Sequence, residues 1–242
     1  MSRVLITGGG SGTGADMARA FHAAGHQVVI AGRRADALAR VADGLPGVRC
    51  VVADVTDEAS VAAMFASAGP CQIVIANAGS GESAPFAHTT LARFNTMIAV
   101  NLTGTFLTLR DGLRQMGPGG RLIAIASVAG LKGAPYVAAY AAAKHGVVGL
   151  VRSVALEVAR KAITCNAICP GYIDTDMTAA TLDNIIAKTG KTRTEALASL
   201  TATNPQGRLI APCEISAMAL WLCSDGAIGV NGQALAITGG EA

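Results

Sequence analysis

The chain contains 242 residues, of which 51% are hydrophobic and only 14% are charged, and its formal net charge is +3. This length suits one large α/β domain with a substantial core, and the scattered basic residues exclude the basic stripe of a nucleic-acid-binding protein. No apolar run reaches the length of a membrane span and the first strand pattern begins at Arg3, so we expect no membrane segment, no signal peptide and a cytoplasmic location.

Short apolar runs alternate with helical patterns along nearly the whole chain. The runs predict strands at residues 3–7, 27–31, 48–53, 72–76, 121–126, 163–168 and 234–237. The patterns between them predict helices near residues 13–24, 35–43, 57–67, 89–115, 137–160 and 212–224. Apolar strands separated by helices are typical of a parallel sheet covered on both faces. We therefore expect a single-domain Rossmann fold over residues 1–242, built on a seven-stranded, doubly wound parallel sheet.

The first strand runs directly into a glycine-rich turn, Thr7-Gly8-Gly9-Gly10-Ser11-Gly12-Thr13-Gly14, and a helical pattern follows. Glycines let the backbone turn sharply, and they let a pyrophosphate approach the N–H groups and the positive end of the next helix. A tight strand–helix corner would also use glycines, but the position in the opening β-α unit favours dinucleotide binding. The candidate contacts are Gly8, Ser11, Gly12, Thr13 and Gly14.

The end of the second strand indicates which dinucleotide is bound. NAD-specific folds place an acidic residue there to hold the ribose 2′-OH, whereas this chain has Arg33 and Arg34. Guanidinium groups bind a 2′-phosphate, so NADP(H) is favoured over NAD(H); the alternative is that these arginines only begin a solvated helix. Asp54, which ends the third strand, is placed to accept a hydrogen bond from the adenine amino group or to cap a helix, and the next residue, Val55, is also a candidate cofactor contact.

Tyr140 and Lys144 are four residues apart, so on a helix their side chains point the same way. Positions 140, 144, 147, 151, 154 and 158 form a stripe that is apolar beyond its first turn, which predicts that it faces the sheet. A cation beside a phenol stabilises the phenolate, so we expect Lys144 to lower the pKa of Tyr140 and to make it a general acid and base. Ser127 ends the fifth strand, where its hydroxyl can hold a carbonyl oxygen beside Tyr140.

These features occur together with Asn77-Ala78-Gly79, Asn101 and Pro170-Gly171, in an order that covers nearly the whole chain. The combination resembles the short-chain dehydrogenase/reductase family, and within it the 3-oxoacyl-thioester (ACP or CoA) reductases and hydroxyacyl dehydrogenases. The resemblance implies a catalytic tetrad of Asn101, Ser127, Tyr140 and Lys144. In that tetrad Lys144 also binds the nicotinamide ribose, and Asn101 holds a water that links Lys144 to solvent.

The resemblance also extends the expected cofactor site. The contacts that it implies beyond the glycine-rich turn and the ribose site are Asn77, Ala78, Gly79, Tyr140, Lys144, Pro170, Gly171, Ile173 and Thr175. The last four of these follow the sixth strand and would fix which face of the nicotinamide delivers hydride. The chain departs from the family pattern at Thr13, where isoleucine is usual, at Ala76, where asparagine is common, and at Ser11, where many NADP-dependent members carry a basic residue.

The segment from residue 172 to 208 is polar, threonine-rich and without a strand pattern, although residues 182–188 and 194–200 could form short helices. Such an excursion after a strand end is usually a lid or substrate loop, with a mobile surface insertion as the alternative. The segment combines apolar residues with Lys188, Lys191, Arg193 and Arg208. This composition suits an acyl chain followed by a phosphorylated carrier, so we expect a 3-oxoacyl thioester of coenzyme A or acyl carrier protein as the substrate.

The sequence predicts a reversible carbonyl reductase that transfers hydride between a nicotinamide and a ketone or secondary alcohol. One alternative is an NAD-dependent 3-hydroxyacyl-CoA or other secondary-alcohol dehydrogenase with the same tetrad, and another is a nucleotide-sensing binding protein without turnover. A sugar epimerase is disfavoured because the chain lacks the length for a second substrate domain.

The remaining expectations concern assembly, cysteines and histidines. Helices at 89–115 and 137–160 are apolar on more than one face, so we expect a homotetramer. The six cysteines lack C-x-x-C spacing and paired histidine ligands, which predicts reduced thiols and no metal site. His145 is expected to pack or to form an interface, and the other histidines, His22, His26 and His88, are expected at ordinary surface positions.

Overall fold

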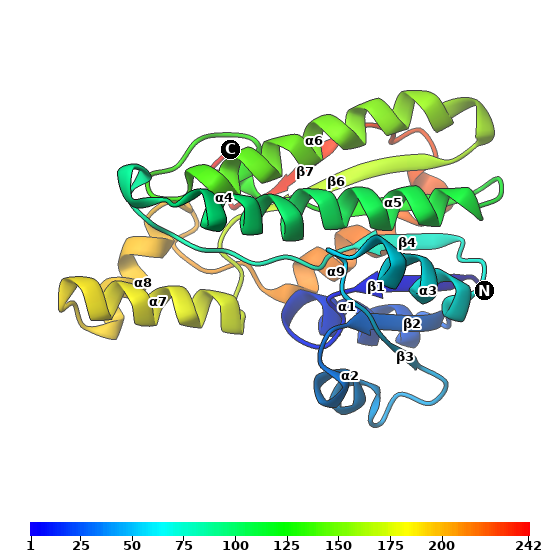
Figure 1. Cartoon of the computed structure of the whole chain (residues 1–242), viewed down its shortest axis with the longest axis horizontal. Helices are drawn as coiled ribbons and strands as arrows, with labels where there is room; N and C mark the ends of the chain where they lie inside the picture. Colours follow the sequence, from blue (N-terminus) through cyan, green and yellow to red (C-terminus); the bar gives the residue numbers. More distant parts are fainter.

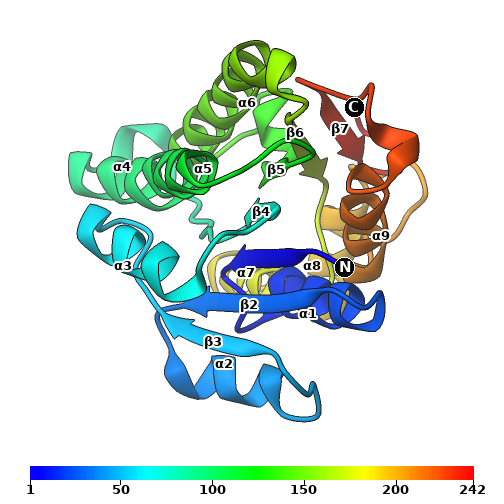
Figure 2. The same cartoon turned by 90° about the vertical axis from the view of Figure 1, so that its right-hand side faces the viewer.

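The computed structural model describes all 242 residues, and its centre is one parallel seven-stranded sheet. The strands lie in the order β3-β2-β1-β4-β5-β6-β7 (Figures 1 and 2), which is the predicted doubly wound arrangement. Their bounds are β1 Arg3–Thr7, β2 Gln27–Gly32, β3 Arg49–Val52, β4 Ile73–Ala76, β5 Arg121–Ile125, β6 Thr164–Pro170 and β7 Ala234–Ile237. The strand order reverses between β1 and β4, so a crevice is expected at the carboxyl edge there.

Both faces of the sheet are covered by helices, and successive strand residues point into two separate cores. In β1, Leu5 belongs to the core under α3, α5 and α6, whereas Val4 and Ile6 belong to the core under α1, α2 and α9. Figure 2 shows these two helix layers on opposite sides of the strands. The helices are α1 Gly12–Ala23, α2 Ala35–Ala42, α3 Glu58–Ala68, α4 Leu91–Ile98, α5 Gly104–Arg114, α6 Ala138–Val158 and α9 Pro212–Leu222.

The prediction of one continuous helix at 89–115 is wrong, because two helices joined by an irregular turn occupy that range. Helix α4 ends at Ile98, a π-helical turn spans Ala99–Thr103, and α5 begins at Gly104. The wider turn places Asn101 in the buried interior. A side chain at position 104 is excluded, because a Cβ there would lie 2.7 Å from a methyl carbon of Val55. Gly104, directly after the irregular turn, therefore lets the start of α5 pack against the segment that follows β3.

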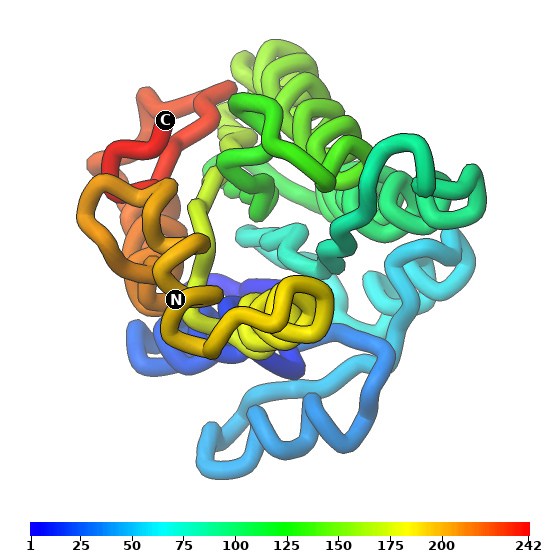
Figure 3. The backbone as a smooth tube through the Cα atoms, turned by 90° about the vertical axis from the view of Figure 1, so that its left-hand side faces the viewer, coloured from blue at the N-terminus to red at the C-terminus, as the bar shows by residue number.

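Both short helices expected after β6 are present, and the first is longer than predicted. Helix α7 spans Asp176–Thr189 and α8 spans Arg193–Thr201, and they share a small core made by Leu182, Ala196 and Leu200. A capping box of Thr192 and Glu195 starts α8. Figures 1 and 3 show this α7–α8 pair projecting beyond the carboxyl edge of the sheet. One backbone bridge, Ile173 to Ile210, closes the base of the excursion.

All six cysteines are free in the structure. Cys71, Cys165 and Cys169 are buried, and burial raises the pKa of each thiol well above its usual range. These three side chains are therefore inert neutral packing residues at neutral pH. None of the helices is long and apolar enough to cross a membrane, and no group of three His, Cys, Asp or Glu side chains could hold a metal ion.

Candidate active site

The candidate site residues come together at the carboxyl edge of the sheet. The glycine-rich turn follows β1, the Asn77–Gly79 segment follows β4, Ser127 follows β5, and Pro170 ends β6. Helix α6 brings Tyr140 and Lys144 to the same edge through its contacts with β6 and the turn after β5. The parallel sheet thus collects groups that are far apart in the sequence.

The glycine-rich turn is packed so tightly that several of its positions accept no side chain. Gly8 has a positive φ of 68°, and a Cβ there would lie 2.9 Å from the Ala78 Cα atom. A Cβ at Gly14 would lie 2.2 Å from the Gly8 carbonyl oxygen. Ser11 is the N-cap residue of α1, and its side chain makes no capping hydrogen bond. The first N–H groups of α1 are therefore left for an anion such as a pyrophosphate.

Asn77 and Thr7 fix the shape of this turn from the side. The Asn77 amide nitrogen donates to the Thr7 carbonyl oxygen at 2.9 Å, and the Thr7 hydroxyl accepts from the backbone N–H groups of Asn77 and Ala78. Asn77, predicted as a cofactor contact, thus joins the ends of β1 and β4. The role of Thr7 was not predicted, although a threonine at the end of a strand before glycines is a usable signal.

The candidate adenosine contacts follow two neighbouring strands, Arg33 and Arg34 after β2 and Asp54 after β3. The Asp54 carboxylate accepts hydrogen bonds from the Thr56 backbone N–H and hydroxyl, and these bonds, with the charge of Arg33, lower the pKa of Asp54. Asp57 caps α3 instead, so the alternative of Asp54 as a helix cap is wrong. Arg34 lines a polar cleft of about 470 Å³ beside Ser11.

Lys144 is almost completely buried, at 4% exposure, under the end of β5. Its Nζ atom donates a hydrogen bond to the Ile125 carbonyl oxygen at 2.8 Å. Burial lowers the pKa of Lys144 to about 8, because the charged ammonium is removed from water. A Cβ at Gly79 would lie 3.7 Å from Nζ and 2.9 Å from the Asn101 side-chain oxygen, so the missing side chain of Gly79 leaves room between these two groups.

The pKa of Tyr140 is raised rather than lowered, which contradicts the prediction from the Tyr–Lys spacing. Burial is the largest cause, and the neighbouring Ser127 hydroxyl acts in the opposite direction. The Lys144 Nζ atom lies 5.6 Å from the centre of the Tyr140 ring and is directed at a carbonyl. Desolvation of the phenolate therefore dominates, and Tyr140 is a protonated phenol at neutral pH.

Ser127 caps the short 3₁₀ helix Val128–Gly130, and its Oγ atom accepts a hydrogen bond from the Ala129 N–H at 3.1 Å. The hydroxyl hydrogen is left to donate, as holding a substrate oxygen requires. Ser127 and Tyr140 are therefore two candidate O–H donors at the end of β5.

Asn101 uses its side chain within the protein. The amide nitrogen donates to the carbonyl oxygens of Ser80 and Met97, and the amide oxygen accepts from the Ser80 N–H at 3.2 Å. These bonds tie the π turn to the segment after Gly79. The expectation that Asn101 holds a water linked to Lys144 stays a prediction.

Comparison with known proteins supports the same grouping. The family model described as enoyl-(acyl carrier protein) reductase matches residues 8–241 of the chain. The chain belongs to the short-chain dehydrogenase/reductase family. This short-chain dehydrogenase/reductase is 36% identical over 243 residues to the 3-oxoacyl-[acyl-carrier-protein] reductase MabA of Mycobacterium tuberculosis, with 98% of this chain and 91% of that protein covered.

Two solved structures of the family resemble the fold closely. An actinorhodin polyketide ketoreductase variant crystallised with NADPH is 33% identical, has a TM-score of 0.90, and is matched over 99% of this chain and 96% of its own. Sorbitol-6-phosphate 2-dehydrogenase from Erwinia amylovora is 30% identical, with a TM-score of 0.93 and 99% coverage of both chains. The present short-chain dehydrogenase/reductase is accordingly an NAD(P)-dependent oxidoreductase with a single Rossmann-type sheet.

The loop after β6 connects the candidate nicotinamide site of the short-chain dehydrogenase/reductase to the α7–α8 pair. Gly171 donates to the Ile237 carbonyl oxygen, and Thr175, which precedes α7, lies against Gly12, where a Cβ would be 3.3 Å from the threonine methyl. Ile173 makes the bridge to Ile210. The predicted contacts Pro170, Gly171, Ile173 and Thr175 thus lie between the glycine-rich turn and the excursion.

Two neighbours of Tyr140 were not predicted from the sequence. Tyr172 and Cys169 both lie near enough for their charges to act on the pKa of Tyr140. Burial raises the pKa of Tyr172, and the carboxylate of Glu241 raises it further. The partly exposed ring of Tyr172 therefore borders the reaction site. Its place in the Pro170-Gly171-Tyr172 run is the sequence feature from which this position could have been predicted.

The histidines of the short-chain dehydrogenase/reductase lie outside this site. His145 is exposed on α6 and its Nδ1 pairs with the Ala141 carbonyl, and His88 is also exposed. His22 bonds the Pro46 carbonyl. The prediction of an ordinary surface position is wrong for His26, which is half-buried with its ring edge-on to Phe21, and burial lowers its pKa.

Proposed function

We propose that the protein uses NADPH to reduce the ketone of a 3-oxoacyl thioester carried by coenzyme A or acyl carrier protein. The observation that carries this proposal is the pairing of a protonated Tyr140 with the Ser127 hydroxyl at the end of β5, beside a buried Lys144. Asn101, Ser127, Tyr140 and Lys144 are its proposed tetrad. The named relatives act on such ketones or on polyketide chains, which supports the substrate class.

The residues fit a nicotinamide dinucleotide, which would supply the hydride when bound. Gly8, Gly12 and Gly14 would admit its pyrophosphate to the uncapped start of α1. In reduction, Ser127 donates a hydrogen bond to the substrate oxygen and Tyr140 gives that oxygen a proton as it gains charge. Lys144 then favours the phenolate that Tyr140 becomes, because its ammonium lies 5.6 Å from the centre of the ring. In oxidation the same groups act in the reverse direction.

A preference for NADPH is part of the proposal. Arg33 and Arg34 are exposed, neither forms an ion pair, and Arg34 lines the cleft beside Ser11. A 2′-phosphate between these groups would gain bidentate hydrogen bonds. Michaelis constants for NADPH and NADH, measured on the wild type and on Arg33→Asp and Arg34→Asp, test this. A lower constant for NADH in the wild type would overturn the preference.

The α7–α8 excursion is the proposed substrate lid. Met177 and Leu197 expose apolar surface there, and Lys188 and Lys191 form no ion pair, which suits an acyl chain and a phosphorylated carrier. Two basic residues of the predicted set are already occupied, because Arg193 pairs with Asp183 and Arg208 pairs with Glu214. The carrier contact is therefore assigned to the two lysines alone.

Substrate competition tests the substrate class. We expect acetoacetyl-CoA to be reduced with a higher kcat/KM than free β-ketoesters, steroid ketones or ketoses. We also expect Lys188→Ala with Lys191→Ala to raise the KM for the thioester without changing that for a free β-ketoester. No preference for the thioester would refute the assignment.

A second candidate function is an NAD-dependent secondary-alcohol dehydrogenase, either for 3-hydroxyacyl-CoA or for another alcohol. The close structural match to sorbitol-6-phosphate 2-dehydrogenase favours keeping it, because that fold accommodates a phosphorylated polyol. Oxidation of an alcohol with NAD at a higher kcat/KM than reduction with NADPH would select this alternative. We further propose that the protein is a cytoplasmic homotetramer.

A further inference from the structure

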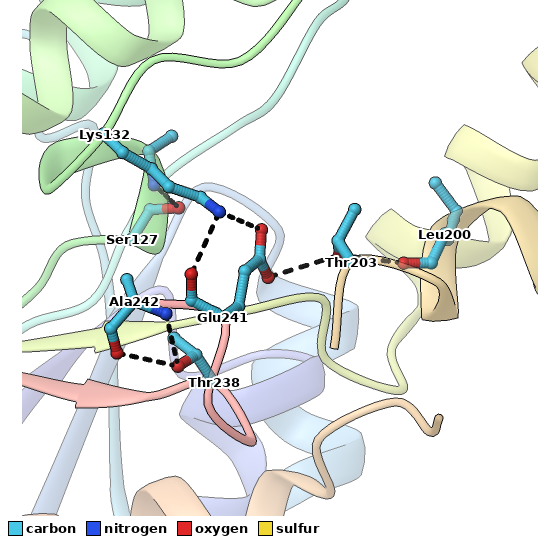
Figure 4. A network of polar contacts seen from close by, with 8 residues as sticks. Ser127, Lys132, Leu200, Thr203, Thr238, Glu241 and Ala242 are labelled. Atoms are coloured by element: carbon cyan, nitrogen blue, oxygen red, sulfur yellow. Dashed lines mark hydrogen bonds and ion pairs between the residues drawn. The ribbon is translucent and has the colours of Figure 1, made fainter. Parts of the chain in front are cut away.

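The penultimate residue, Glu241, lies at the centre of a polar network near the site (Figure 4). Its side chain is only 8% exposed, which is unusual for a carboxylate. One carboxylate oxygen pairs with the Lys132 ammonium at 3.2 Å, and the other accepts from the Thr203 hydroxyl at 3.2 Å. Lys132 also donates to the Glu241 carbonyl oxygen at 3.1 Å. Because it is buried and has specific donors, the Glu241 side chain is held in one position.

The partners of Glu241 belong to three segments that border the reaction site. Lys132 follows the short helix that Ser127 caps, and Thr203 follows α8. The β6 exit lies equally near, because a Cβ at Gly171 would be 3.5 Å from the Glu241 carboxylate. One side chain thus contacts the exits of β5 and β6 and the end of the α7–α8 pair.

The tail that carries Glu241 is held in one shape. Gly239 and Gly240 both have positive φ angles, 64° and 100°. A Cβ at Gly239 would fall onto the Asn204 side chain, and one at Gly240 would lie 3.4 Å from Pro205. The Thr238 hydroxyl bonds both the N–H and the carbonyl oxygen of Ala242 (Figure 4). The tail therefore packs along the segment that follows α8.

We propose that Glu241 is a positioning residue that fastens the end of α8 to the Ser127 and Tyr172 side of the site. This inference rests on the proposed function, because it takes the α7–α8 pair as the substrate lid. The lid has only a three-residue core of its own. Its position over the site depends on outside contacts such as the Thr203–Glu241 bond.

Removing the Glu241 side chain should affect the position of the lid without unfolding the rest of the protein. Lys132 is 43% exposed and regains water when its partner is removed, so no buried charge is left behind. The single hydroxyl hydrogen of Thr203, which Glu241 and the Leu200 carbonyl oxygen share as acceptors, then goes to Leu200 alone. Loss of Glu241 therefore loosens the end of α8 relative to the sheet while both hydrophobic cores stay intact.

The test compares Glu241→Ala and Glu241→Gln with Glu157→Ala, which removes an exposed carboxylate of α6 that has no ion-pair partner. Hydrogen exchange of residues 193–204 is measured without substrate, and kcat and KM are measured with acetoacetyl-CoA. For Glu241→Ala we expect exchange about 10-fold faster in that segment, a KM raised about 10-fold, and a kcat within about threefold of the wild type. Glu241→Gln keeps an acceptor for Thr203, so its exchange rate and KM should lie between those of the wild type and Glu241→Ala. The control, Glu157→Ala, should match the wild type in both.

Two results would overturn the inference. One is unchanged exchange and KM in Glu241→Ala, and the other is a general loss of stability in which exchange rises equally in the sheet and in residues 193–204. The effects of Thr203→Val and Glu241→Ala should be less than additive in the double variant, because both changes break the Thr203–Glu241 bond. If the wild type reduces no thioester, the proposed function fails, whereas the exchange measurement still decides whether Glu241 holds the α7–α8 pair.

Discussion

At the scale of single residues, burial determines the protonation of the two central side chains. The pKa of Tyr140 is raised and that of Lys144 is lowered to about 8, so each group is shifted toward its neutral form. A protonated phenol can give its proton to a ketone oxygen without first having to take one up from solvent. The reductive direction is therefore the one for which the protein groups alone are prepared.

Tyr140→Phe is predicted to lower kcat by at least about 100-fold, because the phenol is the proposed proton donor. The variant should bind NADPH as the wild type does, since the ring still fills the same space. Stopped-flow reduction assays and a fluorescence titration with NADPH measure the two properties separately. Tyr172→Phe is the matched control and should keep most activity; if it proves as inactive as Tyr140→Phe, the assignment of the acid is wrong.

Lys144→Met is predicted to be most stable, relative to the wild type, near pH 7. Below about pH 8 the native protein must hold a buried ammonium, whereas from there to about pH 10 the unfolded chain binds a proton that the native state lacks. Wild-type stability therefore rises with pH in this window, and the relative advantage of the variant should shrink by about 2 kcal/mol between pH 7 and about pH 9.5. Urea unfolding at several pH values measures this; a constant difference would contradict it.

At the scale of elements, the π turn of residues 99–103 places Asn101 against Ser80. Asn101→Ala would leave the Ser80 N–H and carbonyl without their side-chain partners, at a cost of about 1–3 kcal/mol. We predict a lower urea midpoint together with reduced activity, because the Gly79 segment loses its support. Asn95→Ala, at an exposed position of α4, should change neither property. Full activity in Asn101→Ala would show that the turn has no part in shaping the site.

Helix α1 and helix α6 each contain two glycines, and Gly→Ala is predicted to have opposite effects at Gly14 of α1 and Gly149 of α6. A Cβ at Gly14 would lie 2.2 Å from the Gly8 carbonyl oxygen, so Gly14→Ala should destabilise the turn by about 1–3 kcal/mol and weaken cofactor binding. Within one chain nothing lies within 4 Å of a Cβ at Gly149, so Gly149→Ala should stabilise α6 of a dissociated subunit by about 0.5–1 kcal/mol. Thermal melts with and without NADPH measure both effects.

At the scale of the whole molecule, the periodicity of apolar residues in the sequence was sufficient to predict the features that burial of apolar side chains determines. The buried stripe that carries Lys144, Val147 and Val151 follows from helical spacing, and the order of the parallel strands follows from the alternation of elements. The pKa of Tyr140 was not predictable, because a spacing of four residues says nothing about how much water the fold removes. Glu241 was also not predictable, since its contact with Lys132 joins residues 109 positions apart.

Exposed apolar side chains on α4, α5 and α6 motivate the last prediction, which concerns assembly. Leu156 is 82% exposed on α6, and Leu91 and Phe106 expose apolar surface on α4 and α5. Burying such side chains between copies would gain about 25 cal/mol per Å² of apolar surface. We expect sedimentation at micromolar concentration to give the mass of a tetramer for the wild type.

Leu156→Glu should lower that sedimenting mass, because a carboxylate would have to enter the contact without a partner. Val52→Glu is the control, since Val52 is 61% exposed on the edge strand β3, away from these helices, and its substitution should leave the mass unchanged. A wild type that sediments as a monomer would refute the tetramer. An unchanged mass for Leu156→Glu would place the contact on another face of the molecule.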